Sequence, residues 1–92
     1  MRLDLFLKVS RLIVRRSLAQ EFCDSGLIWV NSLAAKSSKE INLGDEIEIR
    51  RRNRITKIRV LSVPAKKQIS RSETDELYVV LSDEAVSEDE LA

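Results

Sequence analysis

The chain has 92 residues, one cysteine and no histidine. This length suits one domain, and the composition excludes an internal disulfide and a Cys-based metal cluster and removes the commonest general base. The formal net charge of +1 conceals an asymmetry, because residues 1–72 carry all 16 lysines and arginines against seven acids, whereas residues 73–92 carry eight acids and no base. Such a basic body indicates a polyanionic partner.

The N-terminal segment predicts a short helix. Leu3, Phe6 and Leu7 recur at the spacing of one helical face. Asp4 falls in the first turn, where the helix dipole favours a carboxylate, and it is spaced to pair with Lys8. We therefore expect a structural rather than a catalytic role for Asp4.

A second helix is expected over about residues 15–25, after a connection at 10–14 whose Leu12 and Ile13 fill the corner between the helices. Gly26 is placed to end this helix. The predicted buried stripe of the helix consists of Leu18, Ala19, Phe22 and Cys23.

The remainder predicts a small sheet. Apolar or alternating runs favour strands at 27–31, 33–35, 46–50, 55–63 and 77–81. Asn31-Ser32 is similar to a hairpin turn, and the basic run 51–54 is expected at a hairpin tip. Imperfect alternation in the fourth run indicates a bulge near Val60, or a strand covered on both faces. Trp29 stands in an apolar run and is expected in the core.

The C-terminal part is polar and then acidic. Residues 65–76 are expected to form a loop. From Ser82 onward large apolar side chains are scarce, which predicts a disordered tail. Two interpretations of this tail stay open: a solubilising extension, or a segment that folds over the basic residues as an RNA mimic.

Basic residues are concentrated in the two predicted helices. The five residues concerned are Arg2, Lys8, Arg11, Arg15 and Arg16. Two of them open the second helix, where cations oppose the helix dipole. A solvated face is the simple alternative, but this unfavourable placement favours a ligand. The interpretation requires the cations to share one face and to stay free of neighbouring carboxylates.

The sequence offers little for catalysis. No nucleophile is paired with a base, no carboxylates cluster, and the two glycines are isolated, which excludes a phosphate-cradling loop. We therefore expect no enzyme, no cofactor and no metal. Aromatic residues are too few for a base-stacking platform, so recognition of folded RNA through its phosphates and shape is the expected mode. No apolar run could form a signal peptide or membrane span, and we expect a cytoplasmic protein.

Several positions together resemble the S4 RNA-binding domain. The matching residues are Arg2-Leu3-Asp4, Phe6-Leu7, Arg11-Leu12, Arg16, Ala19, Gly26, Ile28, Val30-Asn31, Lys36-Ser37 and Gly44-Asp45. The resemblance implies an α+β fold of the S4 (alpha-L) type, with two N-terminal helices packed on a small, mainly antiparallel sheet. The domain and its C-terminal strand extension would cover residues 1–81, and the acidic tail residues 82–92. Ser32 in place of the usual glycine, and Arg15 in place of a Ser or Thr cap, depart from the family pattern.

In size and layout the chain is similar to stand-alone S4 proteins of bacterial ribosome quality control, the RqcP-like type, and more distantly to the heat-shock S4 protein of the large ribosomal subunit. The resemblance implies a non-catalytic protein, monomeric off the ribosome, that binds rRNA and peptidyl-tRNA on obstructed large subunits. It would support C-terminal tailing of the stalled chain by a tRNA-recruiting factor (RqcH-like). Arg2 and Arg16 match the RNA-contacting arginines of the family. The expected RNA-binding set is Arg2, Lys8, Arg11, Arg15, Arg16, Lys36, Lys39, Arg51 and Arg52.

Two other functions stay open. One is an RNA-targeting module for a separate RNA-modification enzyme. The other is a DNA-binding regulator, because two helices and a hairpin could form a winged helix-turn-helix. The bases of the second helix are crowded at one end, however, rather than spread along a recognition helix.

Overall fold

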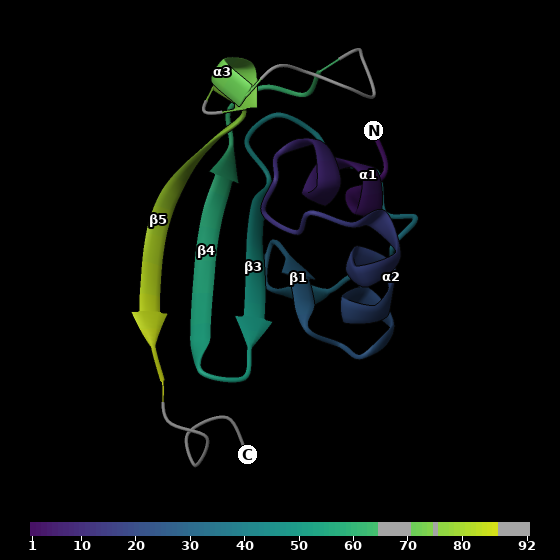
Figure 1. Ribbon diagram of the computed structural model, residues 1–92, viewed down its shortest axis with the longest axis vertical. Coiled ribbons are helices and arrows are strands. Elements are labelled where there is room, and N and C mark those ends of the chain that lie inside the picture. The colour runs from purple at the N-terminus through teal and green to yellow at the C-terminus, as the bar shows by residue number, and fades with distance from the viewer. Residues whose placement is uncertain (65–70, 75, 87–92) are drawn as a thin grey trace.

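The computed structural model describes residues 1–64, 71–74 and 76–86. Two helices come first along the chain, and a five-stranded sheet with one further helical turn follows (Figure 1). The helices are α1 (Leu3–Val9), α2 (Arg16–Asp24) and α3 (Arg71–Thr74), and the strands are β1 (Ile28–Val30), β2 (Leu33–Ala34), β3 (Glu46–Arg51), β4 (Arg54–Val60) and β5 (Tyr78–Ala85).

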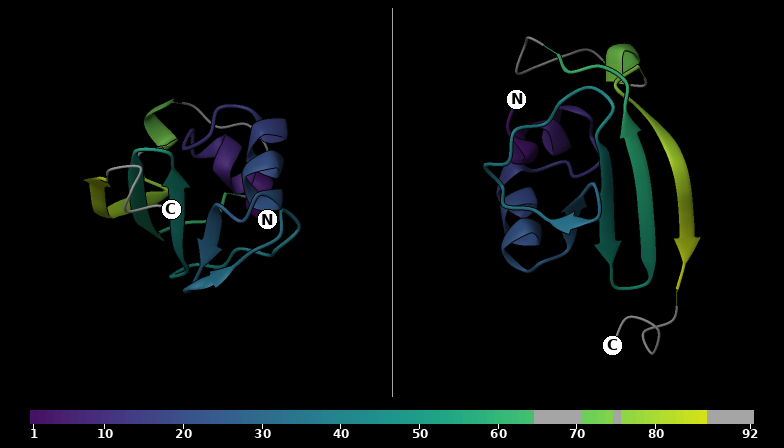
Figure 2. Two further views of the ribbon diagram at one scale, coloured as in Figure 1. Left: turned by 90° about the horizontal axis from the view of Figure 1, so that it is seen from below. Right: turned by 180° about the vertical axis from the view of Figure 1, so that it is seen from behind.

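The strands form one sheet in the order β2-β1-β3-β4-β5, and every neighbouring pair is antiparallel. Helices α1 and α2 lie together near β1 and β3, whereas β5 forms the edge farthest from them (Figure 1, Figure 2). Two N-terminal helices on a small antiparallel sheet confirm the predicted α+β fold class.

The core lies between the helices and the sheet. Alternate residues of a strand point to opposite faces, so Ile47 and Ile49 are buried while Glu46 and Glu48 remain half-buried on the outer face. The main core side chains are Leu3, Phe6, Leu7, Ile13, Ala19, Cys23, Ile28, Val30, Ile41, Ile47, Ile49, Ile58 and Val60. These include the predicted apolar face of the first helix.

The predicted stripe of α2 is wrong at one position. Leu18 is 36% exposed, whereas Ala19 and Cys23 are buried and Phe22 is partly buried. Ala19 and Cys23 are four residues apart and define the buried face. Leu18 is displaced from Ala19 by about 100° around the helix, which turns its side chain toward solvent.

Trp29 does not lie in the core, which corrects the prediction for this residue. It stands between buried Ile28 and Val30, so strand alternation turns its half-buried ring to the outer face of the sheet. There the Arg50 guanidinium lies 4.1 Å from the ring centroid. The indole Nε1 donates a hydrogen bond to the Gly26 carbonyl oxygen at 3.0 Å.

The fourth and fifth strands differ from the prediction in their bounds. β4 ends at Val60, three residues before the predicted end. The predicted bulge near Val60 was wrong: the alternation changes there because β4 ends at Val60. The register against β5 shifts instead between Lys57 and Ile58, where Leu81 of β5 has no partner. α3 lies within the segment 65–76 that was expected to be a loop.

β5 extends to Ala85, so the prediction that the tail begins at Ser82 was wrong for residues 82–85. Asp83 is accommodated in the strand because Thr56 Oγ1 donates a hydrogen bond to its carboxylate at 2.9 Å and Arg54 lies 3.0 Å away. Residues 87–92 of the predicted tail, and both interpretations of its role, lie outside the described residues.

The turn between β1 and β2 has the backbone geometry of a tight hairpin. Asn31 has a φ of 51° and Ser32 a φ of 69°. Two-residue hairpin turns favour positive φ at both positions, which asparagine tolerates and glycine adopts without strain. Ser32 therefore holds a conformation that its side chain disfavours.

We expect Ser32→Gly to raise the free energy of unfolding by about 0.5–1 kcal/mol, because relief of the left-handed strain outweighs the extra freedom of glycine in the unfolded chain. Urea unfolding would measure the change. Ser38→Gly, at an exposed position without a positive φ, is the control and should be neutral or destabilising. Lower stability of the Ser32 variant would contradict the expectation.

Candidate nucleic-acid interface

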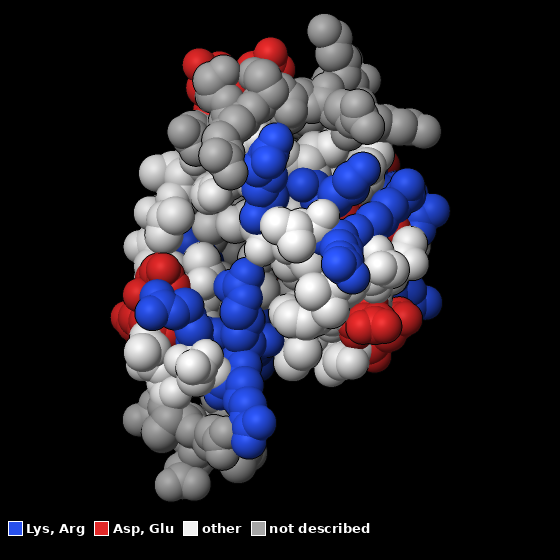
Figure 3. All heavy atoms as spheres, in the orientation of Figure 1, with Lys and Arg blue, Asp and Glu red and all other residues white. Residues whose placement is uncertain are grey.

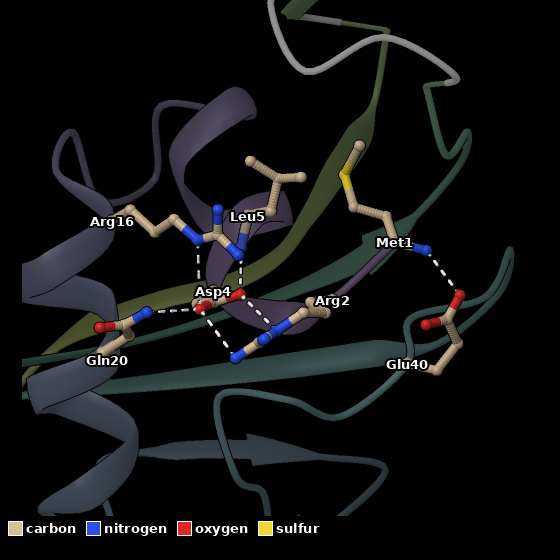
Figure 4. Close-up of polar contacts among 7 residues, drawn as sticks. All are labelled: Met1, Arg2, Asp4, Leu5, Arg16, Gln20 and Glu40. Carbon is tan, nitrogen blue, oxygen red and sulfur yellow. Dashed lines mark hydrogen bonds and ion pairs between the residues drawn. The ribbon is translucent and has the colours of Figure 1, made fainter.

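A buried carboxylate joins the two helices. The Asp4 side chain is fully buried and accepts hydrogen bonds from the Leu5 backbone N–H and from Gln20 Nε2, each at 2.8 Å. Arg16 Nε donates to Asp4 Oδ2 at 3.3 Å, and Arg2 Nη2 donates to the same oxygen at 3.4 Å. Figure 4 shows the side chains from α2 and from the start of α1 converging on Asp4. Arg16 and Gln20 are four residues apart, so α2 presents both on one face.

The surroundings of Asp4 keep it ionised. Burial raises the pKa of this carboxyl, but the hydrogen bonds from Gln20 and Arg16, the charge of Arg16 and the Leu5 N–H together outweigh burial and lower the pKa. Asp4 is therefore a fixed negative charge between two guanidinium groups at neutral pH.

Asp4 offsets one of the two positive charges beside it but leaves both arginines accessible. The side chain of Arg2 is 48% exposed and that of Arg16 is 39% exposed. A guanidinium has five N–H donors, and the contacts with Asp4 occupy a minority of them. The expectation that the basic residues of the helices stay free of neighbouring carboxylates was therefore wrong for Arg2 and Arg16. The carboxylate orients the two side chains instead of covering them.

Three further predicted site residues lie near this pair in the chain. Lys8 is half-buried in α1, and Arg11 and Arg15 are exposed in the connection to α2. Over the described ranges, none of the three forms an ion pair. Lysine and arginine side chains gather over the helices and again along the lower part of β3 and β4 (Figure 3).

The loop that carries Lys36 and Lys39 packs against the start of α1. The Leu3 N–H donates to the Lys39 carbonyl at 2.7 Å, and the Asp4 N–H donates to the Ser37 carbonyl at 3.1 Å. Both lysines are exposed and line a pocket of about 320 Å³ beside the β1–β2 hairpin. The structure thus brings this loop next to the buried carboxylate.

Arg51 and Arg52 lie at the other basic end, on the β3–β4 hairpin. Arg51 is half-buried, and its Nη2 donates to the Leu12 carbonyl at 2.9 Å while Nη1 donates to Thr56 Oγ1 at 3.5 Å. This guanidinium joins the hairpin to the connection between the helices. Arg52 is exposed in the hairpin loop.

Basic residues on the outer face of the sheet are matched by acids. Arg50 Nε lies 2.6 Å from Glu48 Oε2. Glu46 contacts both Lys57, at 3.5 Å, and Arg59, at 3.3 Å. Within residues 1–64, the helices and their connection therefore carry cations without an acidic partner, namely Lys8, Arg11 and Arg15.

Nothing in the sequence was taken to predict a role for Gln20, and Asp4 was expected to pair with Lys8. A signal was present: Asp4 interrupts the apolar face of α1, and α2 carries Arg16 and Gln20 at helical spacing. Such an acid needs partners if it is buried. In the described part of the chain no group of acids and cysteine is placed to hold a metal ion, and no helix is long and apolar enough to cross a membrane.

Known proteins share this sequence pattern and fold. The family model for the S4 domain matches residues 1–47. The chain is 42% identical over 90 residues to the RQC P-site tRNA stabilizing factor of Halalkalibacterium halodurans, covering 98% of this chain and 100% of that protein. It is 40% identical over 88 residues to the factor of the same name from Streptococcus pneumoniae, covering 96% and 98%. The trimeric structure of Vibrio cholerae heat shock protein 15 matches 89% of this chain and 82% of its own, with a TM-score of 0.80 and 27% identity.

The lowered pKa of Asp4 predicts a loss of stability in acid. Its contribution is fully present above the ordinary pKa of about 3.8 and is lost as the pH falls through the lowered value. In Asp4→Asn, which cannot ionise, the free energy of unfolding should therefore fall less between about pH 5 and about pH 2 than in the unsubstituted chain. Urea unfolding at each pH would measure this. Asp24→Asn, an exposed change on α2, should keep the original pH dependence; equal slopes in all three proteins would refute the assignment.

Proposed function

We propose that this chain, which belongs to the S4 domain family, is a non-catalytic RNA-binding protein of ribosome-associated quality control. Relatives that match it over nearly their full length are named RQC P-site tRNA stabilizing factors. The proposed ligands are rRNA and peptidyl-tRNA on obstructed large ribosomal subunits, in the cytoplasm. Binding there would support C-terminal tailing of the stalled chain by a tRNA-recruiting factor.

The observation that carries the proposal is the pair of half-exposed arginines held by Asp4. Guanidinium groups bind phosphate oxygens through two parallel N–H bonds. Folded RNA presents phosphates at fixed spacings and is recognised largely by shape. Arg2, at the N-cap of α1, and Arg16, in α2, share one buried carboxylate, which keeps them close together and suits such a ligand.

We assign the contacts as follows. Arg2 and Arg16 bind the RNA backbone at the centre of the surface. Lys8, Arg11, Arg15, Lys36 and Lys39 add charge around this pair. Arg51 and Arg52 act at the hairpin end, where Arg51 also positions the connection between the helices through its bond to the Leu12 carbonyl.

Arg2→Ala and Arg16→Ala should each weaken binding to large subunits by about tenfold or more, because each removes charge-assisted hydrogen bonds to phosphate. Gradient sedimentation of purified subunits, with and without bound peptidyl-tRNA, would measure this. With about four phosphate contacts, the logarithm of the binding constant should fall with the logarithm of salt concentration with a slope of about −3 to −4.

Arg59→Ala provides the control, because Arg59 is 49% exposed on the outer face of the sheet and contacts Glu46. It should sediment like the unsubstituted chain. Undiminished sedimentation of both the Arg2 and Arg16 variants would count against the proposal. Recovery of an RNA-modification enzyme without ribosomal subunits in a pull-down would favour the alternative of a targeting module.

Asp4→Asn separates orientation of the arginines from net charge. The change removes a negative charge, so charge alone predicts tighter RNA binding. If Asp4 orients Arg2 and Arg16, the affinity should instead fall by about three- to tenfold. Asp24→Asn changes the charge equally at an exposed position of α2 and should bind as tightly as the original chain or tighter. Tighter binding by both variants would exclude the orienting role.

A further inference from the structure

β5 carries a run of exposed apolar side chains. Val79, Val80 and Leu81 are 42%, 51% and 40% exposed. Because successive strand residues point to opposite faces, such a run leaves apolar surface on both faces of the sheet. Val80 is paired with Ile58 of β4. Ile58 is fully buried whereas Val80 is exposed, so the core extends to β4 but does not cover Val80.

β5 is also an edge strand. It follows β4 at the end of the strand order, and no strand of the described residues pairs with its outer side. Figure 1 and Figure 2 show it at the edge of the sheet away from α1 and α2. An exposed edge offers backbone N–H and C=O groups to another strand. An added strand would also cover the apolar side chains of both faces.

Acidic residues flank the apolar run. Glu76 precedes β5 and Glu84 lies near its end, and both are exposed. Asp83 already contacts Arg54 and Thr56, whereas neither glutamate has an ion-pair partner within the ranges that the structure describes. The edge therefore has an apolar centre and acidic ends, which complements a strand with an apolar centre and basic ends.

The same charges disfavour a second copy of this chain. Consider two β5 strands paired antiparallel so that the runs 79–81 face each other. Glu84 of each strand then approaches the start of the other strand, where Glu76 lies in the turn that leads into β5. Like charges directly opposite destabilise a strand pair. The arrangement thus acts against self-pairing and leaves the edge open to a basic segment.

We propose that β5 is a docking edge for an extended segment of a protein partner, apolar at its centre and carrying lysine or arginine at both ends. The segment adds a strand to the sheet and covers Val79 on one face and Val80 on the other. Its cations lie beside Glu76 and Glu84. This edge lies away from α1 and α2, which carry Arg2 and Arg16, and only its end at Ala85, which pairs with Arg54, borders the β3–β4 hairpin (Figure 1, Figure 2). The inference goes beyond the proposed function and does not rest on it.

The probe is a fluorescent peptide of alternating valine and threonine with lysines at both ends. The full chain should bind it in an anisotropy titration, with amide chemical-shift changes centred on β5. The double variant Glu76→Lys with Glu84→Lys should weaken binding by about tenfold, and should bind a peptide with glutamates at both ends instead. Val79→Thr with Val80→Thr, which keeps strand propensity, should also weaken binding.

Two controls make the experiment decisive. Glu21→Lys with Asp24→Lys changes the net charge equally on exposed positions of α2, and should leave affinity for the basic peptide largely unchanged. A peptide with prolines at alternate positions cannot pair with the edge and should not bind. Equal losses in both charge variants, binding of the proline peptide, no binding at all, or self-association through β5 would each overturn the proposal.

Discussion

The ionised carboxylate of Asp4 constrains the whole N-terminal half. A buried charge that loses its partners destabilises a protein by several kcal/mol, so α1 and α2 must keep the relative position that supplies Gln20 and Arg16. The same requirement fixes the guanidinium groups of Arg2 and Arg16 at the surface. The contacts that hold α1 against α2 therefore also determine where the two guanidinium groups are presented.

This contact also explains how α2 can begin with two arginines. Arg15 is the N-cap and Arg16 the first helical residue, and no side chain caps the backbone there. Cations at this end oppose the helix dipole. Asp4 lies beside the first turn of α2 and supplies, from the neighbouring helix, the negative charge that the sequence of α2 lacks.

Local patterns were enough to predict the fold class and most of the elements. The spacing of Leu3, Phe6 and Leu7 predicted α1, and the alternation around Ile47 and Ile49 predicted β3. The family resemblance supplied the arrangement of these elements. Trp29 was wrongly expected in the core because the expectation rested on the apolar composition of its run. The alternation of side chains along a strand places Trp29 on the face opposite Ile28 and Val30.

The contacts that shape the candidate site could not be predicted in the same way, because they join residues distant in sequence. Arg51 contacts a carbonyl 39 residues away. The carboxylate of Asp83, in β5, contacts its cross-strand partner Thr56 and the nearby Arg54. The sequence singled out the basic residues as a group but could not show which of them contact acids. Whether each one contacts RNA is a proposal.

The acids on the outer face of the sheet have a consequence for the approach to a ligand. Glu46 and Glu48 offset two of the three positive charges of Lys57, Arg59 and Arg50, while the helical side keeps its excess of cations. The molecule therefore has an asymmetric charge distribution despite its small net charge, because Glu76, Asp83 and Glu84 lie before and in β5, at the edge away from the helices (Figure 1). In the field of a polyanion it experiences a torque that turns the helices forward within about a Debye length, roughly 8 Å at physiological salt. Encounters would thus be oriented before any hydrogen bond forms, which raises the fraction of collisions that lead to binding.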